Sequence, residues 1–548
     1  MKNSLSINSS TLHQPGSAHI INTVNMGGSV SKIRDSWGSK IGIIMAVAGS
    51  AIGLGNFLRF PAKVAANGGG AFIIPYLIAL FLVGIPLMWV EWALGRFGGG
   101  FGHGTAPGIF HNIWQKNRFI RYFGVIGIFG PLVIFIYYTF IESWTLGYSA
   151  FALFGKLAGI NDQTTMQNFL RGYQGIQNNE FFHGLGWAYL FFLITFSLNI
   201  LVIYHGIKGG IEKLCRWAMP LFFLCALMLM IRVLTLGTPD PSKPDWNISN
   251  GFGFLWNPDF SALLSAKVWL EATGQIFFTL SVGIGVILTY ASYLKKNDDV
   301  VLSGLSAAST NEFAEVILGG SIVIPAAFVF FGPIDTQAIA RSGTFNLGFV
   351  TMPLVLNKLP WPEILAFAWF FLLFLAAITS SVSIAQPAIA FLEDEFDINR
   401  KKAVGIFAVT TFILCQPAIF FLKNGVVDEL DFWGGTVFLV IFGLIEILLF
   451  AWVFGMNNAW DEIHKGANMR IPKIYKFIIK YITPGFLIFI IGMWLWQEWI
   501  GIIMMKTVAD TDKPYILATR IGLIFLFITI AFLVKIAWQR KQQQGVAP

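Results

Sequence analysis

The chain has 548 residues, of which 55% are hydrophobic and only 12% are charged, and its mean hydropathy is +0.67. A soluble globular protein of this length needs more polar surface than this composition supplies, so the soluble classes are excluded. The formal net charge of +8 is explained by basic residues that flank apolar segments and lie next to membrane lipid. The charge therefore does not require a nucleic-acid partner.

Twelve apolar segments, each long enough to cross about 30 Å of hydrocarbon, follow one another along the chain. We predict membrane helices over residues 40–66, 70–97, 121–152, 184–204, 209–234, 265–292, 300–332, 362–394, 402–422, 431–455, 474–500 and 514–537. Lys and Arg are more frequent in the flanks that share a side with the termini, which indicates that both termini are cytoplasmic. The sequence thus predicts an all-α, multi-pass protein of the cell inner membrane.

The sequence outside and between these segments suggests three regions. Residues 1–33 are rich in Ser and Asn and lack the apolar core of a signal peptide, so we expect a disordered cytoplasmic tail. Residues 34–455 would form the membrane core, and residues 456–548 would add helices 11 and 12 and a cytoplasmic C-terminal tail.

Cysteine and histidine give no sign of a metal or redox site. The cysteines lie in apolar segments without CxxC spacing, which predicts buried thiols. They are Cys215, Cys225 and Cys415. The seven histidines contain no HExxH pair, and no pair suited to haem or quinone lies within the spans. We therefore expect no organic cofactor.

Two segments carry glycine and polar residues near the middle of the membrane. Such residues are costly there unless they line a cavity, because a spanning helix must satisfy its own backbone. The runs are Gly49–Asn56 in the first segment and Phe278–Gly285 in the sixth. These two runs lie five spans apart. Because each half of the chain would then contain an odd number of spans, the second half would be inverted in the membrane relative to the first. We therefore predict a 5+5 inverted repeat over about 40–234 and 265–455, with helices 1 and 6 broken. The alternative is that the Gly-x-Gly pairs only allow two helices to pack closely and do not mark a break.

The eighth segment places two hydroxyl groups on one helix face. Ala376, Thr379 and Ser380 have the i, i+3, i+4 spacing, with Ile384 one turn further. Uncharged hydroxyl and carbonyl oxygens suit a sodium ion that must be released. The alternative is that these hydroxyls only bond back to their own helix.

Two other segments present polar residues at i, i+4 spacing. In the third, Ile134 and Tyr138 combine an apolar wall with a phenolic donor that can bind a carboxylate. In the seventh, Asn311 and Glu315 combine an amide suited to a cation with a buried acid. A structural role for Glu315, protonated or paired, is the alternative.

Charged residues lie on both sides of this central region and suggest gates. On the outer side, Arg59 would pair with Asp431, and Asp428 and Glu429 compete for that role. The residues of the corresponding inner gate are Arg34, Trp37 and Asp394.

Eight motifs in one order resemble the neurotransmitter:sodium symporter family, especially the bacterial leucine transporter. They are Gly49–Ala62, Asn67–Leu77, Pro86–Phe97, Ile136–Ser149, Gly274–Val282, Asn311–Ser321, Thr379–Glu395 and Asp428–Val437. The similarity extends from about residue 34 to about residue 538. It implies sodium-coupled symport by alternating access, without a chemical reaction, so we do not expect an enzyme. The alternatives are a proton-coupled amino-acid permease of the same architecture and a non-transporting sensor or channel.

The resemblance also implies residues for two sodium ions and an amino acid. Sodium site 1 would consist of Ala51, Asn56, Thr279 and Asn311, with the substrate carboxylate, and sodium site 2 of Gly49, Ile52, Ala376, Thr379 and Ser380. The substrate would contact Ser50, Ala51, Leu54, Gly55, Ile134, Tyr138, Phe278, Thr279, Ser281, Ile284, Ser380 and Ile384. Tyr138 and Phe278 would form an aromatic lid under the Arg59–Asp431 pair.

Individual positions sharpen the expected substrate. Monoamine carriers have Asp where this chain has Gly53, so the resemblance favours an amino acid. The expected side-chain pocket of Ile134, Ser281, Ile284 and Ile384 is apolar, which favours a neutral hydrophobic one. Chloride-dependent members have Ser where this chain has Glu315, which implies chloride independence. Ser50 and Ile284 stand where the bacterial leucine transporter has Asn and Phe, so leucine itself is not implied. Phe313 stands where that transporter has Lys, and the sequence does not explain this difference. A homodimer is left open.

Overall fold

The computed structural model describes residues 36–341 and 343–543. The predicted tail over residues 1–33 and the predicted gate residue Arg34 lie outside the described residues. The described chain is helical, and its β-structure is confined to one antiparallel bridge between Gly69 and Pro258.

The helices, with short π and 3-10 turns marked η, follow in chain order. The first group is α1 (Lys40–Ala51), η1 (Gly55–Arg59), α2 (Phe60–Ala66), α3 (Gly70–Ala79), η2 (Leu80–Gly84), α4 (Ile85–Gly99), α5 (Ala106–Ile113), α6 (Ile120–Phe123), α7 (Ile126–Leu153), α8 (Gln163–Tyr173), α9 (Gly186–Tyr204), η3 (Ile207–Ile211) and α10 (Glu212–Leu234). The second is α11 (Ile248–Trp256), η4 (Phe260–Leu264), α12 (Ala266–Thr279), α13 (Val286–Ala291), α14 (Val300–Glu312), η5 (Phe313–Gly320), α15 (Ser321–Arg341), α16 (Thr344–Asn346), η6 (Leu347–Thr351) and α17 (Met352–Asn357). The third is α18 (Pro362–Phe396), α19 (Arg400–Phe420), η7 (Leu422–Asn424), α20 (Val426–Phe432), η8 (Trp433–Val437), α21 (Phe438–Leu448), η9 (Leu449–Val453), α22 (Met456–His464), α23 (Ile474–Phe477), η10 (Ile478–Ile482), α24 (Thr483–Gln497), α25 (Trp499–Ile503) and α26 (Lys513–Gln543).

Polar side chains fix where several of these helices begin. Ser39 caps α1 by accepting the amide of Gly42, and Asp299 caps α14 in the same way. Asn399 does so for α19. These caps satisfy amides that have no partner within the helix, so each helix starts where a short polar residue precedes an apolar run.

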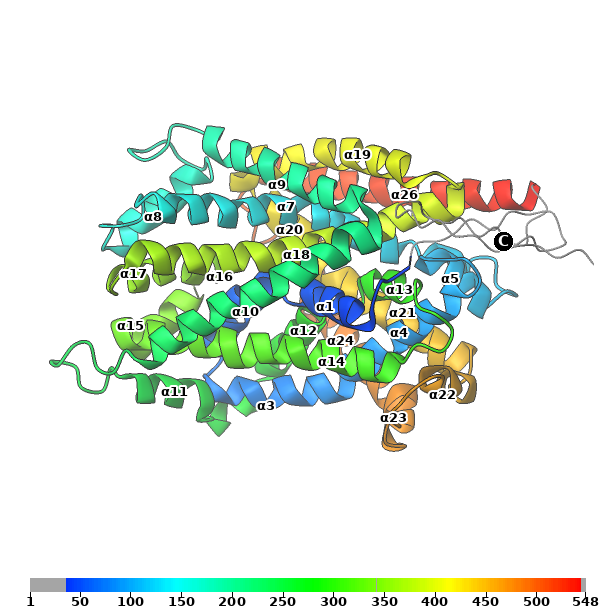
Figure 1. The fold of residues 1–548 in the computed structure, drawn as a ribbon, viewed down its shortest axis with the longest axis horizontal. Helices are drawn as coiled ribbons and strands as arrows, with labels where there is room; N and C mark the ends of the chain where they lie inside the picture. The colour runs from blue at the N-terminus through cyan, green and yellow to red at the C-terminus, as the bar shows by residue number, and fades with distance from the viewer. Residues whose placement is uncertain (1–35, 342, 544–548) are drawn as a thin grey trace, which may run out of the picture. The chain divides into compact units, whose positions relative to one another are not determined.

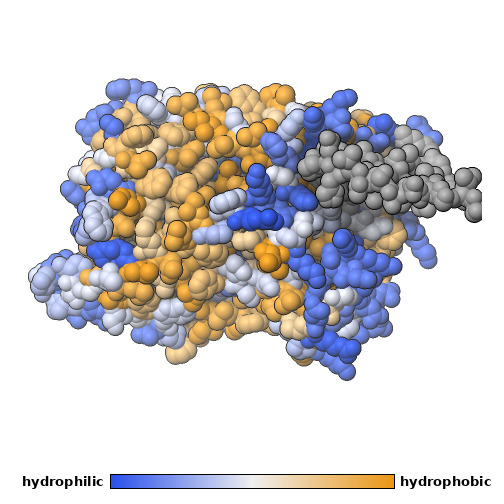
Figure 2. Space-filling model, viewed as in Figure 1, coloured by the Kyte–Doolittle hydropathy of each residue, from blue (hydrophilic) through white to orange (hydrophobic). Residues whose placement is uncertain are grey.

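Ten helical stretches of the described chain are long and apolar enough to cross a membrane, and the bent pair Lys40–Ala51 and Gly55–Ala66 adds an eleventh. Together they correspond to all predicted segments except 265–292, whose helices α12 and α13 have only 14 and 6 residues. Figure 2 shows apolar side chains across the middle of the visible face and hydrophilic ones at both ends. The structure therefore confirms an all-helical, multi-pass membrane protein, while the count of twelve spans stays a prediction.

The core lies where long helices enclose α1. Figure 1 shows α7, α14 and α18 running along the long axis of the view and α10 crossing them obliquely, and α1 packs against α10, α14 and α18. Residues Ala46 to Ala51 of α1 are all buried. A helix surrounded on all sides can end in the interior only if its last carbonyl groups find polar partners there.

The first segment is interrupted after Ala51. The following residue, Ile52, has an extended backbone (ψ 101°), and the helix resumes at Gly55 with a bend of 47°. Gly55 has no room for a side chain, because a Cβ there would lie 2.5 Å from the ring of Phe278. The glycines of this run therefore permit close contact with the sixth segment.

The sixth segment is interrupted between α12 and α13, over residues 280–285. Ser281, Gly283 and Gly285 have positive φ angles of 52°, 74° and 84°. A Cβ on Gly283 would lie 2.3 Å from the carbonyl oxygen of Leu439. Glycine is therefore required here both for its backbone conformation and for close packing against α21.

Candidate functional site

The two interruptions contact each other in the interior. The Ser281 hydroxyl donates to the carbonyl oxygen of Ser50 at 3.1 Å, and the Asn56 amide donates to the Thr279 hydroxyl at 3.3 Å. All four residues are at most 9% exposed. Polar groups released by both breaks therefore share one buried region.

A first cluster gathers four side chains from three segments. The Nδ2 atom of Asn56 lies 2.9 Å from Oδ1 of Asn311 and 3.4 Å from Oε2 of Glu315. The Thr279 hydroxyl donates to the same carboxyl group. The Asn311 amide also lies 3.3 Å from the carbonyl oxygen of Ala51. The structure thus brings together all four residues expected at sodium site 1, with Glu315 beside them.

Two further residues extend this first cluster, and the sequence analysis did not single them out. Gln275 donates to Oε1 of Glu315 at 2.5 Å, and Tyr76 donates to Glu312 at 2.7 Å. Gln275 lies one turn before Thr279, so the i, i+4 spacing could have identified it. Tyr76 comes from α3, and its contact was not predictable from spacing.

A second cluster forms where α18 meets the end of α1. The Ser380 hydroxyl lies 3.3 Å from the carbonyl oxygens of Gly49 and Ile52, and 3.1 Å from those of Ser50 and Ala376. A hydroxyl has one hydrogen, so it can donate to only one of these four oxygens. The remaining lone pairs make the position electronegative and suited to a small cation.

Thr379 borders the second cluster but bonds within its own helix. Its hydroxyl donates to the carbonyl oxygens of Leu375 and Ala376 at 3.0 and 3.1 Å. Thr379 therefore hydrogen-bonds only within its own helix, as the alternative interpretation predicts, whereas the Ser380 hydroxyl also contacts carbonyl oxygens of α1.

A close contact between α1 and α7 lies next to the second cluster. The Tyr138 hydroxyl lies 3.4 Å from the amide nitrogen of Leu54. A Cβ on Gly53 would lie 3.1 Å from both the Tyr138 and the Ser380 hydroxyls, so a larger side chain does not fit without displacement. The Ser50 hydroxyl is buried and has no hydrogen-bond partner in the described chain.

The expected apolar wall residues are also buried in the interior. Ile134, Ile284 and Ile384 are 4%, 6% and 7% exposed. They come from α7, the 280–285 interruption and α18, the same elements that supply the polar groups of the site.

A cavity of about 250 Å³ is lined by Phe278 and by the predicted gate residues Arg59 and Asp431. Arg59 stacks over the Phe278 ring at 4.4 Å, and Asp431 accepts a hydrogen bond of 2.6 Å from Tyr137. Asp428 also lines this cavity. Among the described residues, no Arg59–Asp431 ion pair within 4 Å is found, so this gate stays a prediction.

Glu429, the other candidate partner of Arg59, is engaged elsewhere. It pairs with Arg520 of α26 at 2.5 Å and accepts a hydrogen bond from Trp433. Asp431 and Asp428 therefore remain as the acids that share the outer cavity with Arg59.

Of the residues predicted for the inner gate, Trp37 donates to the carbonyl oxygen of Tyr290 at 3.0 Å, and Asp394 lies near the end of α18. Glu212 accepts bonds from the Gly38 amide and the Ser39 hydroxyl, a contact that the sequence analysis missed. The start of the first segment is therefore held by α10 and by the residues after the sixth-segment break.

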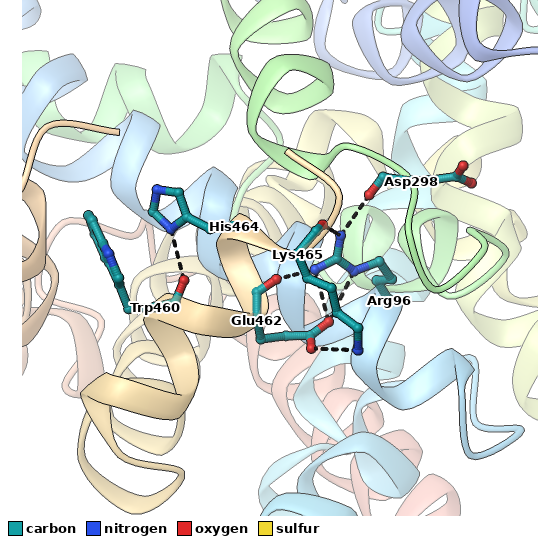
Figure 3. A network of polar contacts seen from close by, with 6 residues as sticks. All are labelled: Arg96, Asp298, Trp460, Glu462, His464 and Lys465. Atoms are coloured by element: carbon teal, nitrogen blue, oxygen red, sulfur yellow. Dashed lines mark hydrogen bonds and ion pairs between the residues drawn. The ribbon is translucent and has the colours of Figure 1, made fainter. Parts of the chain in front are cut away.

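A buried ion pair joins α4 to α22. Figure 3 shows the Arg96 guanidinium surrounded by Glu462, Lys465 and the backbone oxygen of Asp298. Arg96 pairs with the Glu462 carboxylate at 2.9 Å and donates to the carbonyl oxygens of Asp298 and Lys465 at 2.6 and 2.7 Å. This network fixes the inner ends of three segments relative to one another.

The fold and these clusters define a multi-pass membrane protein with a buried polar centre between interrupted helices. The model of the Sodium:neurotransmitter symporter family matches residues 34–166 and 160–502, and the chain belongs to this family. The family resemblance seen in the sequence is therefore confirmed.

Individual relatives agree with this assignment. An uncharacterized sodium-dependent transporter of Methanocaldococcus jannaschii is 31% identical over 458 residues, covering 82% of this chain and 88% of its own. Sodium-dependent nutrient amino acid transporter 1 of Drosophila erecta is 26% identical over 512 residues, and the match covers 83% of this chain and 77% of the Drosophila protein. The crystal structure of MhsT in complex with L-phenylalanine matches with a TM-score of 0.71 and 28% identity, covering 84% of this chain and 99% of that one.

Proposed function

We propose that this chain is a secondary transporter in which sodium drives the import of a neutral hydrophobic amino acid by alternating access. The observation that carries the proposal is the convergence of the Gly49 and Ile52 carbonyl oxygens on the Ser380 hydroxyl. Backbone oxygens freed by a helix break bind sodium without a full negative charge, so the ion can also leave. The family assignment supports the use of sodium.

Two sodium ions would bind at the two clusters. Ser380, Thr379 and the carbonyl groups around them would hold one ion between α18 and α1. The other sodium ion would bind at the first cluster, where its ligands would be Ala51, Asn56, Thr279 and Asn311. The short distances within both clusters support this assignment.

The amino acid would bind between the clusters. Its carboxylate would meet the Tyr138 hydroxyl and the amides after Gly53, and its side chain would contact the buried isoleucines. The limited space at Gly53 supports a substrate that brings its own carboxylate, since an Asp side chain would be crowded there. MhsT, whose crystal structure contains L-phenylalanine, supports a hydrophobic substrate.

Glu315 would make transport independent of chloride. Its carboxyl group lies 3.4 Å from the Asn56 amide at the first cluster. A negative charge at this position would neutralise the sodium ion without an added anion.

The proposed transport cycle requires the architecture expected from the sequence. It has twelve spans in two inverted halves over about 40–234 and 265–455, in the inner membrane with cytoplasmic termini. Because the substrate carboxylate would contact one sodium ion, each ligand would raise the affinity for the other by the same factor. Closing of Arg59 onto Asp431 and separation of Arg34 from Asp394 would then expose the site to the cytoplasm.

A binding panel on purified protein tests this function. Radiolabelled amino acids are measured at equilibrium in sodium and in potassium, each with and without chloride. We expect hydrophobic amino acids to bind only in sodium, with equal affinity in both anion conditions. Equal binding in potassium would contradict the sodium claim and favour a proton-coupled permease, whereas a chloride requirement would contradict the role of Glu315.

Transport itself is tested in proteoliposomes. A transporter accumulates the bound amino acid above its outside concentration when sodium is high outside, and it stops when the sodium gradient is collapsed. A protein that binds but never accumulates the amino acid would be a sensor or channel instead.

A further inference from the structure

A second cavity, of about 340 Å³, lies beside α26, where that helix packs against α7 and α20. Its floor consists of aromatic side chains of α7, α21 and α26. The ring centroids of Phe129, Phe438 and Phe527 lie 5.2–6.5 Å apart. Its mouth includes Ile524 and Ile528, which are 61% and 58% exposed. The cavity is therefore apolar and opens on the outside of the helix bundle.

The mouth of this cavity faces membrane lipid. α26 is a candidate membrane span, and only 28% of its most apolar window is buried inside the protein. The uncharged run 521–534 between Arg520 and Lys535 is about 21 Å long, shorter than the roughly 30 Å of bilayer hydrocarbon. Arg520 therefore lies close to one edge of the hydrocarbon, at the level of lipid ester and phosphate groups. Ile528 lies about 12 Å further along the helix, near the bilayer centre.

The size and lining of the cavity favour a hydrocarbon chain over water or another helix. A buried water needs roughly two to four polar partners, which an apolar cavity does not supply. A helix about 10 Å wide would need on the order of 900 Å³ over a length of about 12 Å, so a second helix does not fit inside. A single hydrocarbon chain, which packs at about 4–4.5 Å from its neighbours, needs only roughly 200 Å³ over that length.

Among the described residues that line the cavity, only Arg520 is charged. Its Nε donates to Glu429 at 2.5 Å, and its Nη1 donates to the carbonyl oxygen of Ile503 at 3.2 Å. A guanidinium has about five N–H donors, so several of them stay available to a ligand. Trp433 also lines the cavity, but its indole N–H donates to Glu429. The arrangement matches a ligand with phosphate oxygens at one end and a hydrocarbon chain at the other.

The cavity also borders the segment that carries a predicted gate residue. Trp433 lies just after Asp431, and Glu429, the ion-pair partner of Arg520, lies just before it. Side chains that line an unfilled void lose dispersion contacts, and a chain that fills the void restores them. A ligand in this cavity therefore stabilises the packing of α20 against α26.

We propose that this cavity binds one acyl chain of a membrane phospholipid, with the lipid phosphate at the Arg520 guanidinium, and that the bound lipid holds α20 against α26. The site is separate from both proposed sodium clusters. It requires only that the protein lies in a membrane, so it does not depend on the proposed substrate or on transport.

Photolabelling tests the site on the full-length protein in vesicles of phosphatidylethanolamine and phosphatidylglycerol. The probe is a phosphatidylglycerol with a diazirine near the end of one acyl chain, and peptide mass spectrometry identifies the labelled residues. We expect adducts on Phe129, which is 1% exposed and is not reached by lipid that only surrounds the protein. Adducts on the exposed Phe525 without any on Phe129 would overturn the proposal.

A variant that fills the cavity tests whether the label enters through it. Ile524→Trp places a larger side chain at the mouth and should lower the labelling of Phe129 about tenfold. Phe525→Trp is the matched control, because Phe525 is the next residue of α26, is 71% exposed and does not line the cavity. Equal labelling of Phe129 in the two variants would contradict the assigned site.

Two further probes keep the test decisive on the wild type if Ile524→Trp fails to fold. A phosphatidylglycerol with the diazirine next to the ester should label Phe129 less than the chain-end probe, because Phe129 contacts Phe527 at the deep end of the cavity. A diacylglycerol with the chain-end diazirine lacks the phosphate and should label Phe129 about tenfold less than the phospholipid. Equal labelling by the two diazirine positions would overturn the orientation of the chain, and equal labelling by the diacylglycerol would overturn the role of Arg520.

Thermal melting in detergent tests the effect of the lipid on α20. Added phosphatidylglycerol should raise the melting temperature of the wild type and of Phe525→Trp, because a ligand of the folded state stabilises it. The melting temperature of Ile524→Trp should not rise. An increase of the same size in all three proteins would overturn the stabilising role of this cavity.

Discussion

Replacing Ser380 by Ala should weaken sodium binding strongly. The Ser380 hydroxyl is the point on which four carbonyl oxygens converge at 3.1–3.3 Å. Hydrogen bonds to charged groups contribute about 1.5–3 kcal/mol, and we take this as the cost of losing one oxygen ligand. Since about 1.4 kcal/mol corresponds to a factor of ten, the sodium concentration for half-maximal amino-acid binding should rise about 10- to 100-fold.

The measurement is equilibrium binding of a radiolabelled amino acid across a range of sodium concentrations at constant ionic strength. Ser381→Ala is the matched control, because the neighbouring hydroxyl donates to Asn199 of α9 at 2.6 Å and does not reach α1. Thermal melting shows whether both variants are folded. If the two variants had the same sodium dependence, the reasoning about Ser380 would be refuted.

Three further predictions test other parts of the structure. Gly55→Ala should lower amino-acid affinity at least tenfold in the binding assay, because the added Cβ would lie 2.5 Å from the Phe278 ring. Gly274→Ala is the control and should keep wild-type affinity, because a Cβ at residue 274 would meet nothing within 4 Å. Equal affinities of the two variants would contradict this reasoning. Glu315→Ser should make binding require chloride, and binding of this variant in chloride-free buffer at wild-type affinity would contradict the proposed charge compensation. Arg96→Ala should destabilise the fold by about 1.5–3 kcal/mol, because it removes a buried guanidinium that pairs with Glu462 and donates to the carbonyl oxygens of Asp298 and Lys465, and an unchanged melting temperature would refute this.

The point at which α1 ends has a local cause. Glycine and polar residues in the middle of an apolar segment are unfavourable unless the helix opens, and α1 ends at Ala51 within the predicted run. The shared face of Ala376 and Ser380 follows from the sequence in the same way, since i, i+4 spacing is a property of one helix, whereas their role as sodium ligands stays a prediction. The extent of the second interruption was less predictable, because it depends on how closely Gly283 approaches α21.

Contacts between distant segments could not be predicted in this way. Glu91 of α4 accepts a hydrogen bond from the amide of Gly283, 192 positions further along the chain, and it appears in the sequence only as a single acid within an apolar run. Phe313 also required the structure, which places its ring 48% exposed and 6.3 Å from the ring of Phe223. It faces outward, away from the first cluster, so its difference from Lys does not change the proposed ion ligands.

The position of α1 explains how two ions could control one conformational change. In the proposed assignment, one sodium ion joins α1 to α18 through Ser380, and the other joins the same segment to α12 and α14 through Asn56, Thr279 and Asn311. An ion can shift a conformational equilibrium only by the difference in its affinity for the two states. Because both ion sites include oxygens from the first segment, any movement of α1 away from α18 or α12 removes ligands from an ion. Sodium would therefore favour only those conformations in which α1 stays in contact with both neighbours, and transport would require α1 to leave one of them.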